Sequence, residues 1–104
     1  MAGVSAIALS ADGRLVAVSA GEFSPDHKIY ITDRSGRSPR KVSGATEGCD
    51  RPVFSPDGQY VYFLSESWPK GFGGEPTVRL MRTTLEGGVQ EVAPAALFER
   101  PLSQ

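Results

Sequence analysis

The chain has 104 residues, of which 39% are hydrophobic and 22% charged, and its formal net charge is −1. This length accommodates one small domain and leaves no room for a second full one. The balanced composition excludes intrinsic disorder, and the near-neutral charge gives no reason to expect nucleic acid or a membrane as a partner.

The 12 glycines and 8 prolines lie between short apolar runs. This distribution favours many turns and short strands over long helices, so we predict an all-β fold. In chain order, the first four strands are expected at residues 4–10, 14–20, 28–33 and 38–43. The next four are expected at residues 51–55, 59–65, 78–84 and 89–93.

The clearest turn, Ser55-Pro56-Asp57-Gly58, joins the fifth and sixth expected strands. Ser55 can accept a hydrogen bond at the first turn position, and Pro56 presets φ for the second. Asp57 suits the third position, and Gly58 allows the chain to leave the turn. A weaker copy, in which Ala11 replaces the proline, lies 45 residues earlier. The pattern predicts an antiparallel hairpin at each place.

The two halves of the chain read as copies of one unit. Residues 4–20 align with residues 49–65 at an offset of 45, and the next strand of each copy aligns at an offset of 50. The second copy therefore carries five extra residues. They fall in segment 66–77, whose glycines and prolines predict a long loop.

Two large aromatic residues, Trp68 and Phe72, lie in this loop. Exposed aromatic side chains often anchor interfaces, so both are candidate partner contacts. The alternative is that they fold back over their own sheet or cover a neighbouring subunit or domain.

We expect residues 1–48 to form the first unit, residues 49–93 the second, and residues 94–104 a tail or the start of a further unit. Four short strands in a repeat of about 40 to 50 residues are typical of the blades of a β-propeller, in which small twisted antiparallel sheets stack face to face.

The second copy combines an apolar strand, the Ser55–Gly58 turn and the strand Tyr60–Ser65, and the first copy contributes Ile29–Asp33 before a glycine turn. This pattern resembles the WD40-like repeat known as PD40, over about residues 4–93. Such repeats build the propellers of TolB-like proteins, tricorn-type proteases and the prolyl oligopeptidase family, including its acylaminoacyl and dipeptidyl peptidase branches. The resemblance implies two four-stranded antiparallel blades of a partial propeller, and it identifies a blade and not an activity.

Closed propellers need at least about four blades, so two would leave sheet faces uncovered. We therefore expect the chain to be a piece of a larger propeller, with the remaining blades as its partners, or to self-associate. The resemblance implies a non-catalytic segment of a prolyl oligopeptidase-family serine peptidase, whose propeller gates peptide access to a hydrolase domain absent from these residues. The alternative is a TolB-like or WD40-like scaffold that binds a peptide or protein through its loops or central funnel.

Within these residues we expect no catalytic group, cofactor or metal site. His27 is the only histidine, no Gly-x-Ser-x-Gly elbow accompanies it, and a solvated loop position is predicted. Cys49 is the only cysteine, and the neighbouring acids Glu47 and Asp50 should raise its pKa, which favours a structural role. One cysteine and one histidine cannot form a closed zinc site.

A basic run consists of Arg34, Arg37, Arg40 and Lys41. A phosphate or nucleic-acid patch is one interpretation, but Asp33 interrupts the run, and charged residues commonly protect the edges of sheets. We prefer a solvated sheet edge.

A single cysteine excludes an intrachain disulfide and mildly favours a reducing compartment. The N-terminal residues reach Asp12 without the basic start and apolar core of a secretory signal. No apolar run approaches the roughly 18 residues that span a membrane. A cytoplasmic location is predicted, or a periplasmic one if the protein is TolB-like with its signal removed.

Overall fold

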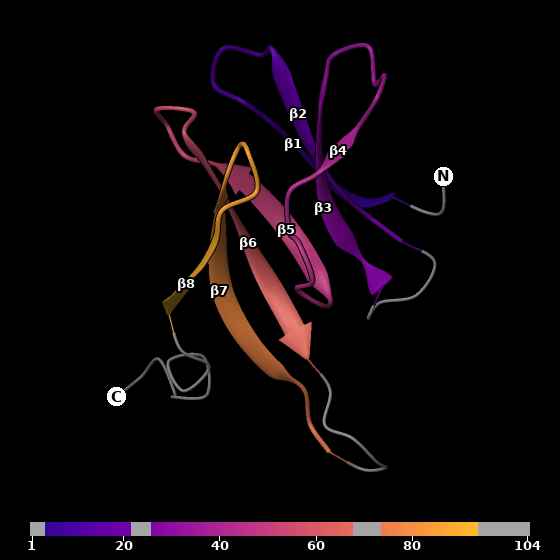
Figure 1. The fold of residues 1–104 in the computed structure, drawn as a ribbon, viewed down its shortest axis with the longest axis vertical. Coiled ribbons are helices and arrows are strands. Elements are labelled where there is room, and N and C mark those ends of the chain that lie inside the picture. The colour runs from indigo at the N-terminus through magenta and orange to yellow at the C-terminus, as the bar shows by residue number, and fades with distance from the viewer. Residues whose placement is uncertain (1–3, 22–25, 68–73, 94–104) are drawn as a thin grey trace.

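The computed structural model describes residues 4–21, 26–67 and 74–93, and it confirms an all-β fold there (Figure 1). Eight strands form two four-stranded antiparallel sheets, in which strands adjacent in sequence pair with each other. The first sheet contains β1 (Val4–Leu9), β2 (Leu15–Ala20), β3 (Lys28–Asp33) and β4 (Arg40–Lys41). The second sheet contains β5 (Cys49–Phe54), β6 (Tyr60–Ser67), β7 (Thr77–Thr84) and β8 (Val89–Ala93). Each of them overlaps a strand expected from the sequence.

Strand β4 is shorter than the predicted strand at residues 38–43. Ser38 has a φ of 50°, which is left-handed and not extended. Pro39 has no N–H with which to join the ladder. Hydrogen bonding to β3 continues past β4, where the N–H of Val42 donates to the carbonyl of Ile29 at 2.9 Å. The edge of the first sheet is therefore held by few backbone bonds.

The turns between β1 and β2 and between β5 and β6 have the same internal hydrogen bonds. Ser10 Oγ donates to Asp12 Oδ1 at 2.7 Å, and Ser55 Oγ donates to Asp57 Oδ1 at the same distance. The glycine after each aspartate has a positive φ, of 73° or 75°. Both hairpins predicted from the sequence are present, and the alanine that replaces proline at position 11 leaves the turn geometry unchanged.

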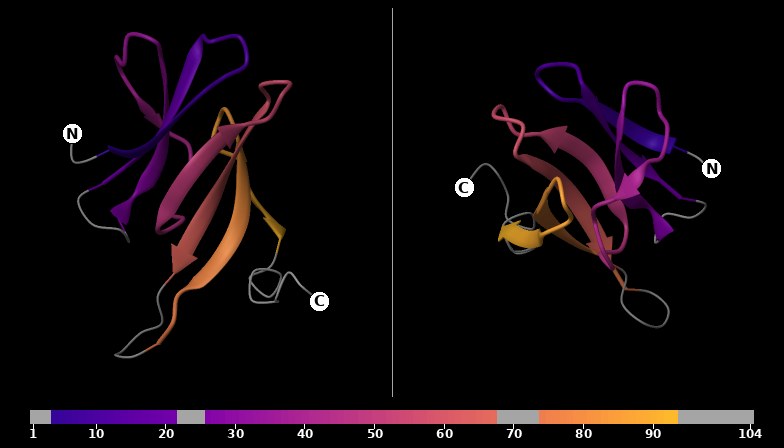
Figure 2. Two further views of the ribbon diagram at one scale, coloured as in Figure 1. Left: turned by 180° about the vertical axis from the view of Figure 1, so that it is seen from behind. Right: turned by 45° about the horizontal axis from the view of Figure 1, so that its top comes forward.

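The two sheets pack through one face each. Strand β5 lies against β1, β2 and β3 of the first sheet (Figure 2). The core between the sheets consists of Ala17, Ile29, Ile31, Val42, Cys49, Phe54, Val61 and Phe63. We call the face of the second sheet that carries Phe54 its front face, and the face of the first sheet that carries Ala17 its back face. The core thus joins a back face to a front face.

The strand registers correct the predicted offset for the third strand of each unit. Tyr30 of β3 pairs with Val18, whereas Met81 of β7 pairs with Phe63. Val18 and Phe63 are 45 residues apart, but Tyr30 and Met81 are 51 apart. The predicted offset of 50 is therefore wrong by one, and a shift of one residue exchanges the two faces of a strand. The apolar residues of β3 and β7 suggested the wrong alignment because apolar residues occur on both faces of each strand.

Candidate functional site

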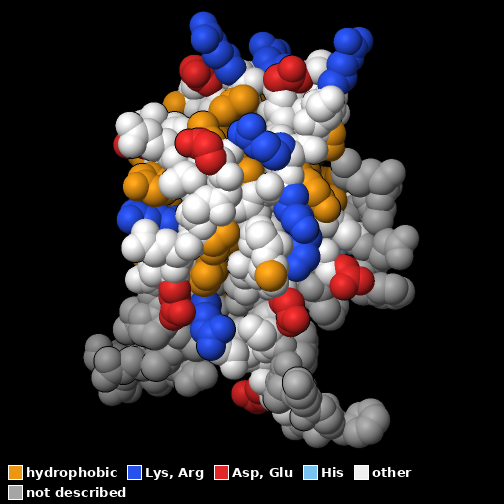
Figure 3. Space-filling model, viewed as in Figure 1, with side chains coloured by type: hydrophobic (Ala, Val, Ile, Leu, Met, Phe, Trp, Pro, Cys, Tyr) orange, Lys and Arg blue, Asp and Glu red, His pale blue; other side chains and the backbone are white. Residues whose placement is uncertain are grey.

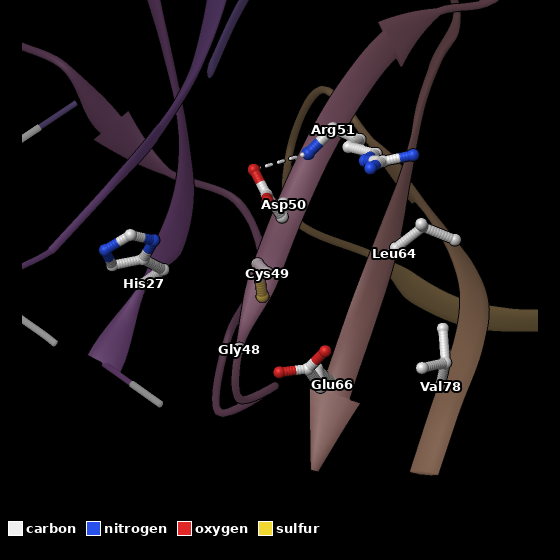
Figure 4. A pocket seen from close by; sticks show the side chains of 8 residues that line it. All are labelled: His27, Gly48, Cys49, Asp50, Arg51, Leu64, Glu66 and Val78. Carbon is white, nitrogen blue, oxygen red and sulfur yellow. Dashed lines mark hydrogen bonds between the residues drawn. The ribbon is translucent and has the colours of Figure 1, made fainter. Parts of the chain in front are cut away.

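A pocket of about 270 Å³ lies beside the start of β5, at the seam between the two sheets. It is lined by His27, Gly48, Cys49, Asp50, Arg51, Leu64, Glu66 and Val78 (Figure 4). Arg51 has a φ of 55°, and the ladder between β5 and β6 is irregular from Asp50 to Val53. This β-bulge bends β5 at the pocket and places Arg51 and Pro52 opposite the single residue Phe63 of β6.

The hydroxyl of Ser5 lies in a small polar cluster beside this pocket. Its Oγ is 3.1 Å from Ser19 Oγ, 3.3 Å from His27 Nδ1 and 3.2 Å from Asp50 Oδ1. Ser19 in turn donates to the carbonyl of Cys49 at 2.5 Å. The cluster therefore links strands β1 and β2 of the first sheet to β5 of the second.

His27 lies in the loop just before β3, as predicted, and its side chain is half-buried at the seam and not fully solvated. Its carbonyl accepts a hydrogen bond from the N–H of Cys49 at 3.1 Å, which ties the segment before β3 to β5. Sequence reasoning missed this because the partners, Ser5 and Cys49, are far away along the chain. The repeat itself held a usable signal, since Ser5 and Asp50 occupy equivalent positions 45 residues apart.

The Ser5 cluster does not have the arrangement of a Ser-His-Asp triad. In a triad, the carboxylate orients the histidine by accepting from its ring, and the histidine activates the serine. Here Asp50 Oδ1 accepts instead from Ser5 Oγ and from the N–H of Arg51, the latter at 2.9 Å. The geometry is that of a structural hydrogen-bond network at the seam.

Cys49 is fully buried, and its thiol lies 3.3 Å from the carbonyl of Thr46. Burial raises the pKa of the thiol, although hydrogen bonding with Ser43 and the charge of Lys28 act in the opposite direction. The expected direction is confirmed, but its main cause is desolvation and not the neighbouring acids. Among the described residues, no group of three or more His, Cys, Asp and Glu side chains could hold a metal ion.

All four residues of the basic run are exposed, and one of them, Arg40, bridges the two sheets. Arg40 Nη2 donates to the carbonyl of Leu85 at 2.6 Å and so joins β4 to the turn after β7. Arg34, Arg37 and Lys41 are exposed. Figure 3 shows Lys and Arg side chains at the end of the molecule where the β1–β2 and β3–β4 turns lie, together with acidic side chains. This mixture of signs fits a solvated edge better than an anion-binding patch.

Each sheet also exposes apolar residues on the face turned away from the core. Cross-strand pairing places Ile7, Leu9, Val16 and Val18 together on the outer face of the first sheet, where Ile7 and Leu9 are exposed and Val18 is buried. Pairing likewise places Val53, Tyr62 and Arg82 together on the outer face of the second sheet. Arg82 lies over the ring of Tyr60, with its guanidinium carbon 4.3 Å from the ring centroid.

The repeat relates the buried face of each sheet to the exposed face of the other. Phe54, 8% exposed on the front face of the second sheet, is equivalent to Leu9, which is 62% exposed. Ala8, which packs against the core, is equivalent to Val53 of β5, which is 58% exposed. The outer face of the first sheet is therefore a second front face, and the outer face of the second sheet is a second back face.

The aromatic residues predicted as partner contacts, Trp68 and Phe72, lie outside the described residues. No family model and no curated protein matches the chain. In the part of the chain that the structure describes, no helix has the length and apolar character needed to cross a membrane.

Proposed function

We propose that the chain is a non-catalytic pair of consecutive propeller blades. One observation carries the proposal: the face that each sheet exposes is equivalent to the face that the other sheet buries. Units that stack by repeating one rotation always join a back face to a front face, so a stack of two leaves one of each uncovered. This is the contact pattern of propeller blades.

We further propose, from the PD40 resemblance, that these blades belong to a prolyl oligopeptidase-family serine peptidase and help to gate peptide access to its hydrolase domain. The seam geometry supports a non-catalytic role, because Asp50 accepts from Ser5 and does not orient His27. The reacting serine is then expected outside this chain.

A fluorophosphonate probe, which labels activated serines, tests the peptidase assignment. The natural protein that carries residues 4–93 is isolated with an antibody against this chain and treated with the probe. We expect a label that peptide mass spectrometry maps to a serine outside these residues, and unchanged labelling when Ser5→Ala is introduced. An unlabelled protein, as the scaffold alternative predicts, or a label on a serine of this chain would contradict the assignment.

Blade stacking is tested separately by hydroxyl-radical footprinting. Leu9 and Val53 should be oxidised more slowly in the natural protein than in dilute, monomeric 104-residue chain, because further sheets would cover them. Asp12, which is exposed at a turn, serves as the reference and should not change. Equal oxidation of Leu9 in both samples would reject the stacking.

A further inference from the structure

The chain contains two Asp-Gly bonds, Asp12-Gly13 and Asp57-Gly58, one in each unit. Aspartate isomerises most readily before glycine, because glycine has no side chain to hinder attack by its own backbone nitrogen. The chain has no asparagine, which would undergo the related deamidation. Every other aspartate precedes histidine or arginine: Asp26, Asp33 and Asp50. Rearrangement of the backbone at aspartate is therefore concentrated at two equivalent turns.

This isomerisation needs no reagent except water. The glycine nitrogen attacks the carboxyl carbon of the aspartate side chain, a C–N bond forms, and the carboxyl hydroxyl leaves with the amide proton as water. Water then opens the resulting succinimide ring. Opening at the side-chain carbonyl restores aspartate, whereas opening at the main-chain carbonyl gives isoaspartate, whose backbone runs through the former side chain. The first step requires a protonated carboxyl group and a glycine nitrogen that is free to approach it.

In the turn between β5 and β6, one serine binds both reacting groups. Ser55 Oγ donates to Asp57 Oδ1 at 2.7 Å, and the carbonyl of Ser55 accepts from the N–H of Gly58 at 2.9 Å. The N–H of Gln59 also donates to Asp57 Oδ1, at 3.0 Å. The hydroxyl of Ser55 is the larger of these two causes that lower the pKa of Asp57. The turn therefore keeps the carboxylate ionised and the glycine nitrogen occupied.

The turn between β1 and β2 repeats this arrangement. Ser10 Oγ donates to Asp12 Oδ1 at 2.7 Å, and the N–H of Gly13 donates to the carbonyl of Ser10 at 2.9 Å. The N–H of Arg14 donates to Asp12 Oδ1 at 2.9 Å. Both aspartates are exposed, whereas Ser10 and Ser55 are each only 8% exposed. Water therefore reaches the carboxylates but competes poorly for the serine hydroxyls that hold them.

We propose that Asp12 and Asp57 are latent isomerisation sites, at which the hydroxyls of Ser10 and Ser55 suppress the formation of isoaspartate. Without the hydroxyl, only the N–H of the second residue after the aspartate would hold each carboxylate. The consequence of isomerisation would be structural, because isoaspartate adds one methylene to the backbone of a tight turn.

The turn at Asp57 has little room for such an insertion. The N–H of Ser55 donates to the carbonyl of Tyr60 at 2.8 Å and so closes the hairpin of β5 and β6. The residues on either side, Phe54 and Val61, belong to the core between the sheets. Protection of Asp57 therefore preserves the register of the two strands that carry this part of the core.

The test compares wild type, Ser55→Ala and Ser10→Ala, each incubated for several weeks at neutral pH and body temperature. Isoaspartate is measured at each site by isoaspartyl methyltransferase labelling and peptide mass spectrometry. In Ser55→Ala, isomerisation at Asp57 should accelerate by at least about tenfold, the factor that corresponds to loss of a hydrogen bond to a charged group. The rate at Asp12 should stay that of the wild type. Ser10→Ala should give the reverse pattern.

Each turn is the internal control for the other, because unfolding of the whole chain would expose both Asp-Gly bonds. Thr83→Val, which removes a buried hydrogen bond far along the chain from either turn, is the matched control for lost stability. It should change the two rates by the same factor. Circular dichroism verifies that each serine variant is folded, and Ser10→Ala tests the proposal independently if Ser55→Ala does not fold.

Three results would overturn the inference. The first is an unchanged rate at Asp57 in folded Ser55→Ala together with an unchanged rate at Asp12 in folded Ser10→Ala. The second is acceleration of both sites by the same factor in a folded serine variant, which would assign the effect to opening of the whole chain. The third is isomerisation of the wild-type chain as fast as that of the chain unfolded in guanidinium chloride.

Discussion

Ser5 Oγ lies 3.2 Å from Asp50 Oδ1, and the two residues hold the same position in successive units, 45 residues apart. When two units are related by a rotation, equivalent residues can touch only where the displacement between the units is short. Strands β1 and β5, which carry these residues, are therefore close to the axis that relates the sheets. Strands β4 and β8 lie well apart in Figures 1 and 2, so the two sheets diverge with distance from β1 and β5.

Gly48 should be far less tolerant of substitution than Gly58, although both have positive φ, of 57° and 75°. A Cβ at Gly48 would lie 2.1 Å from the carbonyl oxygen of Glu66, whereas one at Gly58 would have no neighbour within 4 Å. We expect Gly58→Ala to cost about 1–2 kcal/mol from backbone conformation alone. Gly48→Ala should cost at least about 4 kcal/mol, because backbone must move. Urea unfolding measures both, and equal losses would refute the close approach.

The buried hydroxyl of Thr83 should contribute more to stability than that of its equivalent, Thr32. Thr83→Val removes the donor that reaches the carbonyl of Val42 at 2.8 Å inside the sheet contact. We expect a loss of about 1–3 kcal/mol in the free energy of unfolding, since a buried acceptor loses its partner. Thr32→Val, where the hydroxyl reaches only an exposed turn, should change stability by less than about 0.5 kcal/mol.

Both variants should be unfolded in urea at a concentration at which the chain is monomeric, so that Thr32 is not covered by a second copy. A loss for Thr32→Val as large as that for Thr83→Val would contradict the assignment of the two faces.

The strands and hairpins could be predicted because their signals are local. Ser55 and Asp57 form the turn with groups only a few residues away, and the same bonds recur around Asp12. The register of β7 could not be predicted, because it depends on pairing with β6 across the intervening loop. Because β7 has apolar residues on both of its faces, its hydrophobic pattern fits two alignments that differ by one residue.

The hydrogen bonds at the seam between the sheets also could not be predicted from local sequence. Its main bonds join residues that are distant in sequence, such as Ser19 with Cys49 and Arg40 with Leu85. His27 lies in a loop, as its polar sequence neighbours indicate, but its contacts with Ser5 and Cys49 could not be read from those neighbours. A repeat predicts which faces are alike, but it does not predict which polar groups meet where the units touch.

Ser55→Ala should raise the pKa of Asp57 towards its ordinary value. The hydroxyl of Ser55 is the main cause that lowers this pKa, followed by the N–H of Gln59. A lowered folded-state pKa adds stability above the ordinary carboxyl pKa, and this stability is lost as the pH falls through the lowered value. The variant should therefore lose less stability on acidification than the wild type. Carbon-13 titration of the carboxyl groups measures the shift.

Asp12 serves as an internal control for that titration, because its pKa is lowered by its own Ser10 hydroxyl. It should stay lowered in Ser55→Ala and rise in Ser10→Ala. An unchanged pKa of Asp57 in Ser55→Ala would mean that the backbone N–H alone holds the carboxylate.

Cys49 should react with thiol reagents only when the chain opens. Its side chain is fully buried, and burial raises its pKa, so that little thiolate is present and none is accessible. A raised folded-state pKa stabilises the fold below the ordinary thiol pKa, and this stabilisation is lost as the pH rises through the raised value. Iodoacetamide modification should therefore be slow at neutral pH, and urea should accelerate it in parallel with unfolding.

The Cys49 thiol should react faster in Gly48→Ala than in Gly58→Ala at equal urea concentration, because Gly48→Ala disturbs the residue next to the thiol. Rapid modification of the native wild-type chain at neutral pH would show that the seam opens without unfolding of the sheets.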